Sequence, residues 1–217
     1  KQRIDRRFMQ RFQPSAMGNA EALAKGDPML CRGCAAKLPA ATLEAALFTA
    51  GVGGLAIAPE DAAVVPSSNG AKGTVLLQSV DGFPALVSDP WVNGRLTALH
   101  ACSDLWACGA SVQSAQAVVT LPLAPPSIQQ HLLAQTIAGI RSALDPQQAV
   151  LIGGHTLEER NPAPTPCSLG LQLVLSVHGS PHRNLWPKRG LQAGDQLLLS
   201  RPLGTGVLFA AAMAGAT

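Results

Sequence analysis

A cysteine and a lysine stand three positions apart in the stretch LCRGCAAKLPA, residues 30–40. The thiolate is the nucleophilic form of cysteine, and a nearby positive charge lowers the thiol pKa, so Cys34 followed by Lys37 suits an activated thiol. Cys31 precedes Cys34 by three, which also allows a redox pair or two structural thiols. A closed zinc site is disfavoured, because no second Cys-x-x-Cys or histidine pair supplies the remaining ligands.

Three aspartates stand where secondary-structure elements are expected to begin, end or leave room for a ligand. Asp61 precedes a short strand, Asp81 ends a strand and is followed by Gly82, and Asp104 lies among small residues on a long helix. Magnesium in proteins is held by a few carboxylates together with substrate phosphates. The three aspartates are therefore candidate metal ligands, with caps and turn residues as the ordinary alternative.

A glycine-rich stretch, GGHT, follows the apolar run AVLI. Backbone N–H groups in a turn after a strand can bind an anion, so Gly153, Gly154, His155 and Thr156 are candidate phosphate contacts. The stretch lacks the GK[ST] ending of a Walker motif, and a plain tight turn is the alternative.

Strand-like and helix-like segments alternate along the chain, which predicts the α+β class, with helices packed on a sheet. Asp89, Pro90 and Gly109 are suited to begin and end the longest helix. The expected helices are 38–50, 89–110, 125–144 and one starting at 203, and the expected strands are 61–66, 74–83, 113–123, 149–156, 167–179 and part of 190–202.

Composition narrows the class of protein. The 217 residues are 47% hydrophobic and only 13% charged, so a large core is expected and part of the surface should be covered by a partner. The net charge of +3 reflects basic residues within the first eleven positions, which argues against a nucleic-acid-binding face. No apolar run reaches the roughly 18 residues that span a bilayer. Five cysteines do not form a disulfide framework, and a reducing cytoplasm is expected.

The distribution of residue types predicts three parts. Residues 1–28 are expected to be a linker or the tail of a covalently fused upstream module, 29–185 the main domain, and 186–217 the truncated start of a second domain. The first residue is not Met, so we expect the chain to be a piece of a longer polypeptide.

Several of these stretches resemble selenophosphate synthetases (selenide, water dikinases) of the aminoimidazole-ribotide synthetase superfamily. The matching segments follow one another in the family's order. They are CAAKLPAATLEAAL (34–47), PEDAAVV (59–65), SVDGFPALVSDPWVNGRLTALHACSDLWACGA (79–110), LIGGHTLE (151–158) and AGDQLLLSRPLGTGV (193–207). The segment 79–110 is the most specific of them. The resemblance implies a mixed sheet flanked by helices that dimerises through the sheet, followed by a second domain.

The resemblance also implies roles for the candidate residues. Cys34 would be the catalytic thiol, and Lys37 would contact phosphate. The three aspartates would hold Mg²⁺ bridging the phosphates of ATP, and the glycine stretch would lie against a nucleotide, often one bound by the other subunit; these residues are Asp61, Asp81, Asp104, Gly153, Gly154, His155 and Thr156. Two departures are Ala36, where many members have a second cysteine, and Ser79-Val80, where the family has a threonine pair.

The expected activity is the conversion of selenide, ATP and water into selenophosphate, AMP and phosphate by a cytoplasmic homodimer. The piece alone is expected to be inactive, because a further metal-binding aspartate would lie beyond Thr217. One alternative is another ATP-using member of the superfamily, such as a thiamine-phosphate kinase or a hydrogenase-maturation relative, against which Cys34 with Lys37 argues. The other is a non-catalytic dimerising or redox-relay domain that uses Cys31 and Cys34.

Overall fold

The structure is a computed structural model that describes residues 38–51, 60–66, 75–159 and 171–213. The catalytic pair expected from the sequence, Cys34 and Lys37, lies outside the described residues, as does Cys31.

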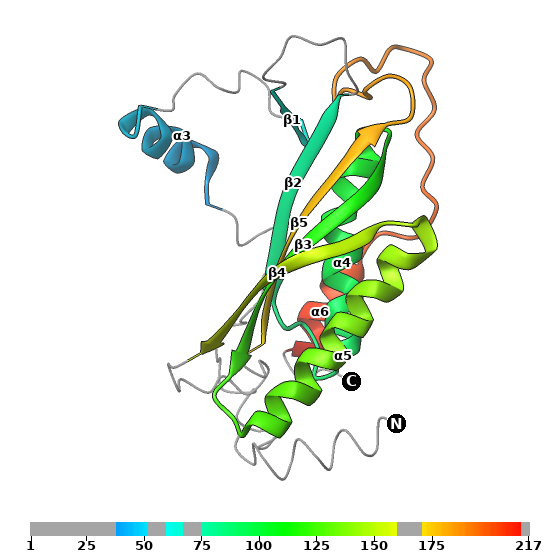
Figure 1. Cartoon of the computed structure of the whole chain (residues 1–217). Coiled ribbons are helices and arrows are strands. Elements are labelled where there is room, and N and C mark those ends of the chain that lie inside the picture. Colours follow the sequence, from blue (N-terminus) through cyan, green and yellow to red (C-terminus); the bar gives the residue numbers. More distant parts are fainter. Residues whose placement is uncertain (1–37, 52–59, 67–74, 160–170, 214–217) are drawn as a thin grey trace.

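A five-stranded mixed sheet forms the centre of the described chain, with the strand order β1-β2-β5-β3-β4 (Figure 1). All neighbouring strands pair antiparallel except β3 and β4, which are parallel. The strands are β1 (Ala63–Val65), β2 (Leu76–Pro84), β3 (Ala110–Pro122), β4 (Val150–Glu159) and β5 (Gln172–Pro181).

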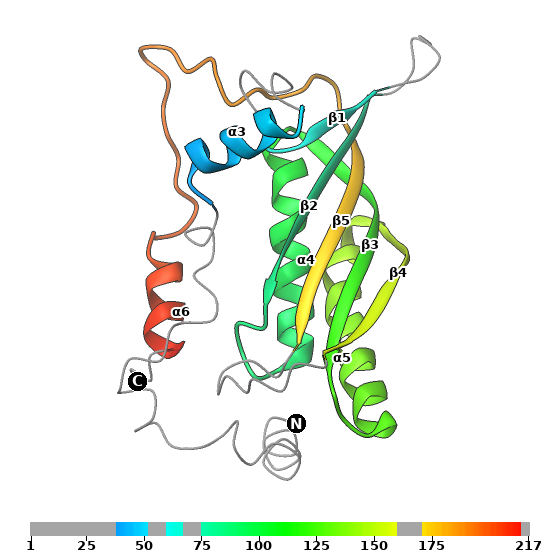
Figure 2. The ribbon, with the colours of Figure 1, turned by 90° about the vertical axis from the view of Figure 1, so that its left-hand side faces the viewer.

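Two long helices, α4 (Pro90–Ala107) and α5 (Pro126–Leu144), cover one face of this sheet (Figure 2). Buried residues alternate along β2, β3 and β5 and point toward these helices, as Leu77 on β2 and Leu175 on β5 illustrate. The period-two burial pattern on the strands gives one apolar layer between sheet and helices. The α+β class with a mixed sheet flanked by helices is thereby confirmed.

The long helix α4 begins and ends at the residues that the sequence predicts. The side chain of Asp89 accepts a hydrogen bond from the backbone N–H of Val92 at 3.0 Å, and Pro90 occupies the first turn. Gly109 follows the helix with a φ of 73°, a backbone conformation that favours glycine. These local signals fix where the helix lies relative to β2, and therefore where Asp104 lies.

Helices α4 and α5 touch through their backbones at two glycines. A Cβ on Gly139 would lie 2.0 Å from the carbonyl oxygen of Trp91, and a Cβ on Gly94 would lie 2.2 Å from that of Thr136. Only glycine fits at both positions, so the helix pair has one closely defined crossing.

Three shorter helical elements complete the described chain. Helix α3 (Ala40–Thr49) follows Pro39, ends before Gly51 and has no buried residue. A short 3-10 helix, η2 (Asp145–Gln147), follows α5, and α6 (Thr205–Met213) lies near the end of the described chain. In Figure 2, α3 and α6 lie to one side of the sheet and its two long helices. No helix in the described ranges is long and apolar enough to cross a membrane.

Three sequence predictions about local structure are wrong. Strand β2 does not end at Asp81 and Gly82 but continues to Pro84, because the bare Gly82 lets β5 approach its backbone. Strand β4 runs through the glycines of GGHT without turning. No strand forms within 190–202, where the three leucines 197–199 are 81%, 90% and 72% exposed.

Candidate active site

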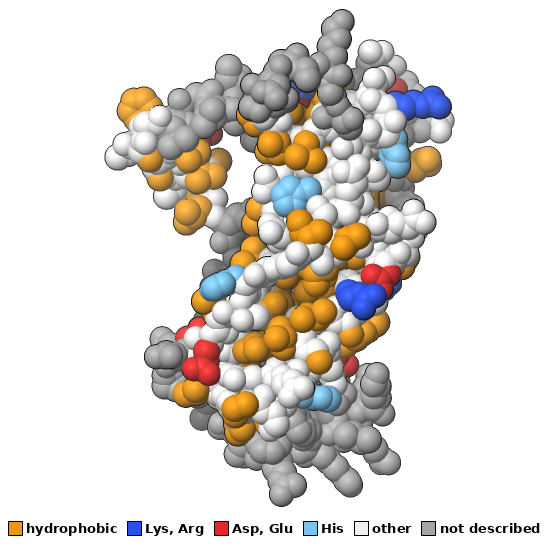
Figure 3. Space-filling model, in the orientation of Figure 1, with side chains coloured by type: hydrophobic (Ala, Val, Ile, Leu, Met, Phe, Trp, Pro, Cys, Tyr) orange, Lys and Arg blue, Asp and Glu red, His pale blue; other side chains and the backbone are white. Residues whose placement is uncertain are grey.

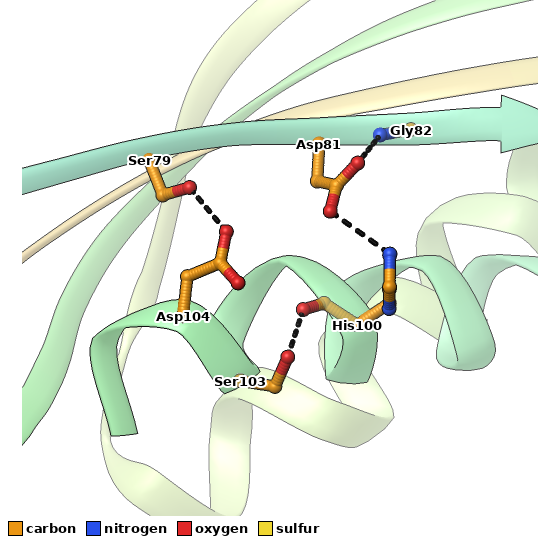
Figure 4. Close-up of polar contacts among 6 residues, drawn as sticks. All are labelled: Ser79, Asp81, Gly82, His100, Ser103 and Asp104. Carbon is orange, nitrogen blue, oxygen red and sulfur yellow. Dashed lines mark hydrogen bonds and ion pairs between the residues drawn. The ribbon is translucent and has the colours of Figure 1, made fainter. Parts of the chain in front are cut away.

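Two of the predicted metal ligands, Asp81 and Asp104, face the space between β2 and α4 (Figure 4). Asp81 is on the same side of β2 as the buried Leu77 and Ser79, and Asp104 is in the last turn of α4. The packing of the helix on the sheet brings these two carboxylates together from positions 23 residues apart in the sequence.

Asp81 is held by a histidine and by the backbone. Its Oδ2 lies 2.9 Å from Nε2 of His100, and its Oδ1 accepts a hydrogen bond from the N–H of Gly82 at 3.0 Å. The ring of His100 also packs against Phe83, with 5.4 Å between ring centroids. The Asp81 side chain is only 18% exposed, so its orientation is set by these contacts.

Asp104 is held by a hydroxyl group of the facing strand. The Ser79 Oγ donates a hydrogen bond to Asp104 Oδ2 at 2.5 Å, and Ser79 itself is 9% exposed. Because Ser79 and Asp81 lie two positions apart on one face of β2, and His100 and Asp104 lie four apart on one face of α4, the contacts form two rungs between strand and helix.

Asp61 reaches the same end of the sheet from the chain before β1. Asp61 lies two residues before Ala63, which pairs with Gln78 next to Ser79 on β2. The Oδ1 of Asp61 is 2.7 Å from Nζ of Lys188, which comes from the segment that follows β5.

Lys188 lies beside acidic residues. Its backbone N–H donates a hydrogen bond to Glu60 Oε2 at 2.8 Å, beside the ion pair with Asp61. The hydrogen bond with Asp61 has the largest effect and raises the pKa of the Lys188 ammonium; burial opposes it, and the negative charges of Asp61, Glu60 and Asp104 add to the rise. Lys188 therefore lies within the electrostatic reach of Asp61, Glu60 and Asp104.

The donor set fits a hard divalent cation. All three candidate ligands are carboxylates, the oxygen donors that Mg²⁺ prefers, and a lysine ammonium already occupies the region as a stand-in cation. Each carboxylate already has a side-chain partner: Lys188 for Asp61, His100 for Asp81 and Ser79 for Asp104. As they stand, no three His, Cys, Asp or Glu side chains in the described ranges are grouped closely enough to hold a metal. Metal binding would therefore require these side chains to change partners.

The glycine stretch lies elsewhere, on the edge strand β4. Three strand spacings separate β4 from β2, a distance of about 14 Å. Gly154 pairs with Ala117 so closely that a Cβ there would lie 1.9 Å from the Ala117 carbonyl oxygen. The predicted nucleotide contacts therefore do not join the carboxylates within one sheet.

A cavity of about 320 Å³ lies beside the glycine stretch, between β4 and α5. Figure 3 shows hydrophobic side chains gathered on this side of the molecule, with few charged groups among them. The walls of the cavity are largely apolar, and the glycine stretch supplies backbone and polar groups. The cavity is lined by Ala117, Val119, Leu133, Ile137, Leu151, Ile152, Gly153, Gly154, His155 and Thr156. The cavity therefore combines an apolar lining with the backbone of the glycine stretch.

Asp61, Asp81 and Asp104 with their partners are called the carboxylate region below. Two of its residues were not predicted from the sequence. His100 is not among the candidate residues predicted from the sequence, although its spacing of four from Asp104 on a helix places both on one face. Lys188 had no comparable signal, because 127 positions separate it from Asp61 and only the folded chain brings the two together.

The family is shown by comparison with known proteins. Residues 59–174, more than half of the chain, match the family described as AIR synthase related protein, N-terminal domain. The chain belongs to this family. The matched region includes all three aspartates and the glycine stretch.

Similar curated proteins carry the name selenide, water dikinase. One from Pelobacter propionicus is 36% identical over 141 residues, which cover 64% of this chain and 37% of that protein. One from Nitrosomonas eutropha is 30% identical over 207 residues, covering 92% of this chain and 54% of that protein. The resemblance predicted from the sequence is confirmed, and the chain spans about half or less of these relatives' length.

Solved structures share the fold at low sequence identity. Thiamine monophosphate kinase from Aquifex aeolicus aligns with a TM-score of 0.50 and 14% identity, covering 67% of this chain and 43% of that chain. A structure described as AaThiL complexed with AMPPCP and TMP has a TM-score of 0.53 and 15% identity, with 72% and 48% covered. These likenesses establish the AIR synthase-like fold.

Proposed function

We propose that this chain is the N-terminal, nucleotide- and magnesium-binding part of a cytoplasmic selenide, water dikinase. The enzyme would convert selenide, ATP and water into selenophosphate, AMP and phosphate. The observation that carries the proposal is the pair of carboxylates, Asp81 and Asp104, facing each other from β2 and α4 within the most specific matching block. The names of the curated relatives support the substrate.

The carboxylates would hold the metal. Asp61, Asp81 and Asp104 are the residues that would bind Mg²⁺ here. A bound magnesium ion would neutralise the charge of the ATP phosphates and orient them for transfer. Ser79 and His100 would keep the two buried carboxylates oriented between strand and helix.

The thiol and the nearby lysine would complete the chemistry from outside the described residues. In this proposal Cys34 accepts or delivers selenide, and Lys37 contacts the phosphates. The proximity of a lysine would favour the thiolate form that such a role requires. Support for these roles comes from the resemblance of residues 34–47 and not from geometry.

The resemblance implies a homodimer formed through the sheet, in which the glycine stretch of one subunit would contact the nucleotide of the other. The sheet face opposite the helices carries apolar side chains that are exposed in the single chain, which supports this arrangement. They are Leu76 (37%), Val80 (59%), Val118 (37%) and Val174 (38%), and they lie side by side on β2, β3 and β5. Gly153–Thr156 would then lie against a nucleotide held by the partner.

The oligomeric state tests this arrangement. We expect Val80→Asp to shift the chain from dimer to monomer in analytical ultracentrifugation, because a buried charge in an interface is costly. Leu123→Asp is the matched control, since Leu123 is 67% exposed in the segment between β3 and α5. A wild-type chain that sediments as a monomer at all concentrations would contradict the proposed dimer.

The product of the reaction tests the function. The full-length protein should form AMP from ATP only when selenide is present, with selenophosphate detected by ³¹P NMR. Cys34→Ser and Asp104→Asn should each lower AMP formation by about a hundredfold or more, since each removes a reacting or metal-binding group. Cys31→Ser and Asp145→Asn are matched controls; Asp145 pairs with Arg141 at the end of α5, away from the site.

Two outcomes would assign the chain to another class. Formation of ADP with a phosphorylated small molecule would favour a kinase of the kind seen among the structural neighbours. Absence of any ATP turnover together with a reversible Cys31–Cys34 disulfide, seen by non-reducing mass spectrometry, would favour a redox relay.

A further inference from the structure

The segment that follows β5 is fastened to the end of α4. The N–H of His182 donates to the carbonyl oxygen of Gly109 at 3.2 Å, and the N–H of Trp186 donates to that of Cys108 at 3.1 Å. The ring of Trp186 covers Gly109, where a Cβ would lie 2.8 Å from it. The chain is thereby directed back toward the carboxylate region.

At Lys188 the segment that follows β5 contacts two acidic residues. The backbone N–H of Lys188 bonds to Glu60, and its ammonium pairs with Asp61. The two contacts differ in kind, because the first fixes the backbone and the second fixes only the tip of a side chain that is 48% exposed. The ammonium can therefore leave Asp61 while the lysine backbone stays where it is.

We propose that Lys188 is a phosphate-binding residue of the nucleotide site, and that its ammonium pairs with Asp61 until a divalent cation takes that carboxylate. The proposal rests on the proposed function for the presence of a metal-bound nucleotide at these aspartates.

Simple electrostatics leads from the ion pair to the phosphates. A divalent cation on Asp61 competes with the ammonium for the same oxygen and repels it. The phosphates that such a cation carries lie next to it and are anionic. Lysine is a flexible point charge that binds phosphate well, and the contact with Glu60 keeps it within side-chain reach.

The proposal predicts changes of opposite sign for the metal and for the nucleotide. In Lys188→Ala, the binding of Mn²⁺ alone, measured by the EPR signal of free Mn²⁺, should tighten about two- to fivefold, the range expected for removing an exposed ion pair. ATP binding in excess Mg²⁺, measured by calorimetry, should weaken about tenfold, because one charged hydrogen bond is lost.

Matched variants separate charge from folding. Lys188→Gln keeps the length of the side chain and should behave like Lys188→Ala, whereas Lys188→Arg should retain ATP binding. Arg189→Ala removes a neighbouring positive charge that has no ion pair among the described residues, and should change neither affinity by more than about twofold.

The proposal requires both changes. A variant Lys188→Ala with unchanged or weaker Mn²⁺ binding, or with unchanged ATP binding, overturns it, and so does a wild-type chain that binds no Mn²⁺. Because neither readout uses selenide or AMP, a protein that binds both ligands as described but makes no selenophosphate would refute the proposed function and leave Lys188 in its role.

Discussion

The carboxylate region and the glycine stretch occupy opposite kinds of position in the same sheet. Asp81 and Asp104 lie between a strand and a helix that bury their shared side, and each carboxylate has a fixed partner. Residues 153–156 lie on the edge strand β4, where seven of the eight residues 151–158 are exposed. The carboxylates of the proposed site are therefore held by packing within the chain, whereas its glycine stretch is exposed on the surface of the single chain.

The largest expected effect comes from breaking the helix pair that positions Asp104. Gly139→Ala would place a Cβ 2.0 Å from the Trp91 carbonyl oxygen, so the two helices must separate. We expect the free energy of unfolding to fall by about 3 kcal/mol in urea denaturation. Gly206→Ala, at a helical glycine with open space around it, is the control and should cost nothing. Equal stability of the Gly139 variant and wild type would show that the helix contact does not set the site.

A smaller and local loss is expected at the edge strand. Gly154→Ala would place a Cβ 1.9 Å from the Ala117 carbonyl oxygen, forcing β4 away from β3. We expect amide exchange to increase across 150–159 but not across β2 or β5, with a stability cost of about 1–3 kcal/mol. Ile152→Ala, which shortens an exposed side chain on the same strand, should remain within about 0.5 kcal/mol of wild type. Loss of protection throughout the sheet would contradict the separation of the two regions.

Removing one negative charge from the carboxylate region should lower metal affinity more than it lowers the stability of the fold. Asp104→Asn keeps an oxygen acceptor for Ser79, so the melting temperature should change little, while Mn²⁺ affinity should fall about tenfold, or about 1.4 kcal/mol. Calorimetry measures the affinity, with Asp145→Asn as the control. A large loss of stability instead would mean that Asp104 serves the core and not a ligand.

The smallest effect concerns the buried thiol of Cys102, on the side of α4 that contacts Gln147. Burial raises the pKa of Cys102 from 9.0 to about 11, against a lesser lowering by its hydrogen bond from Gln147. As the pH rises, the Cys102 thiol therefore ionises in the unfolded state before it does in the folded state. Its contribution to folding stability is fully present below pH 9 and should decline between pH 9 and 11. Urea denaturation across this range should show a smaller decline in Cys102→Ala. Rapid alkylation of Cys102 in the folded chain at pH 8 would contradict its burial.

Much of the carboxylate region could be predicted because its signals are local. Asp89, Pro90 and Gly109 mark the limits of α4, and residue types alone identify the candidate ligands. The turn predicted for the glycine stretch is wrong, because glycine can either turn a chain or allow a neighbour to approach closely, and only the pairing with Ala117 shows which applies. The pairing of Lys188 with Asp61 is a product of the whole fold and has no local signature.

The position of β5 has a consequence for how the chain reaches its folded state. The last strand in the sequence lies in the centre of the sheet, between β2 and β3. During synthesis β2 and β3 must therefore wait, each with an unpaired edge, until the ribosome has delivered residue 181. The β1–β2 and α4/α5 contacts are closer in sequence, so we expect the pairing of β5 with β2 and β3 to be the late step of folding.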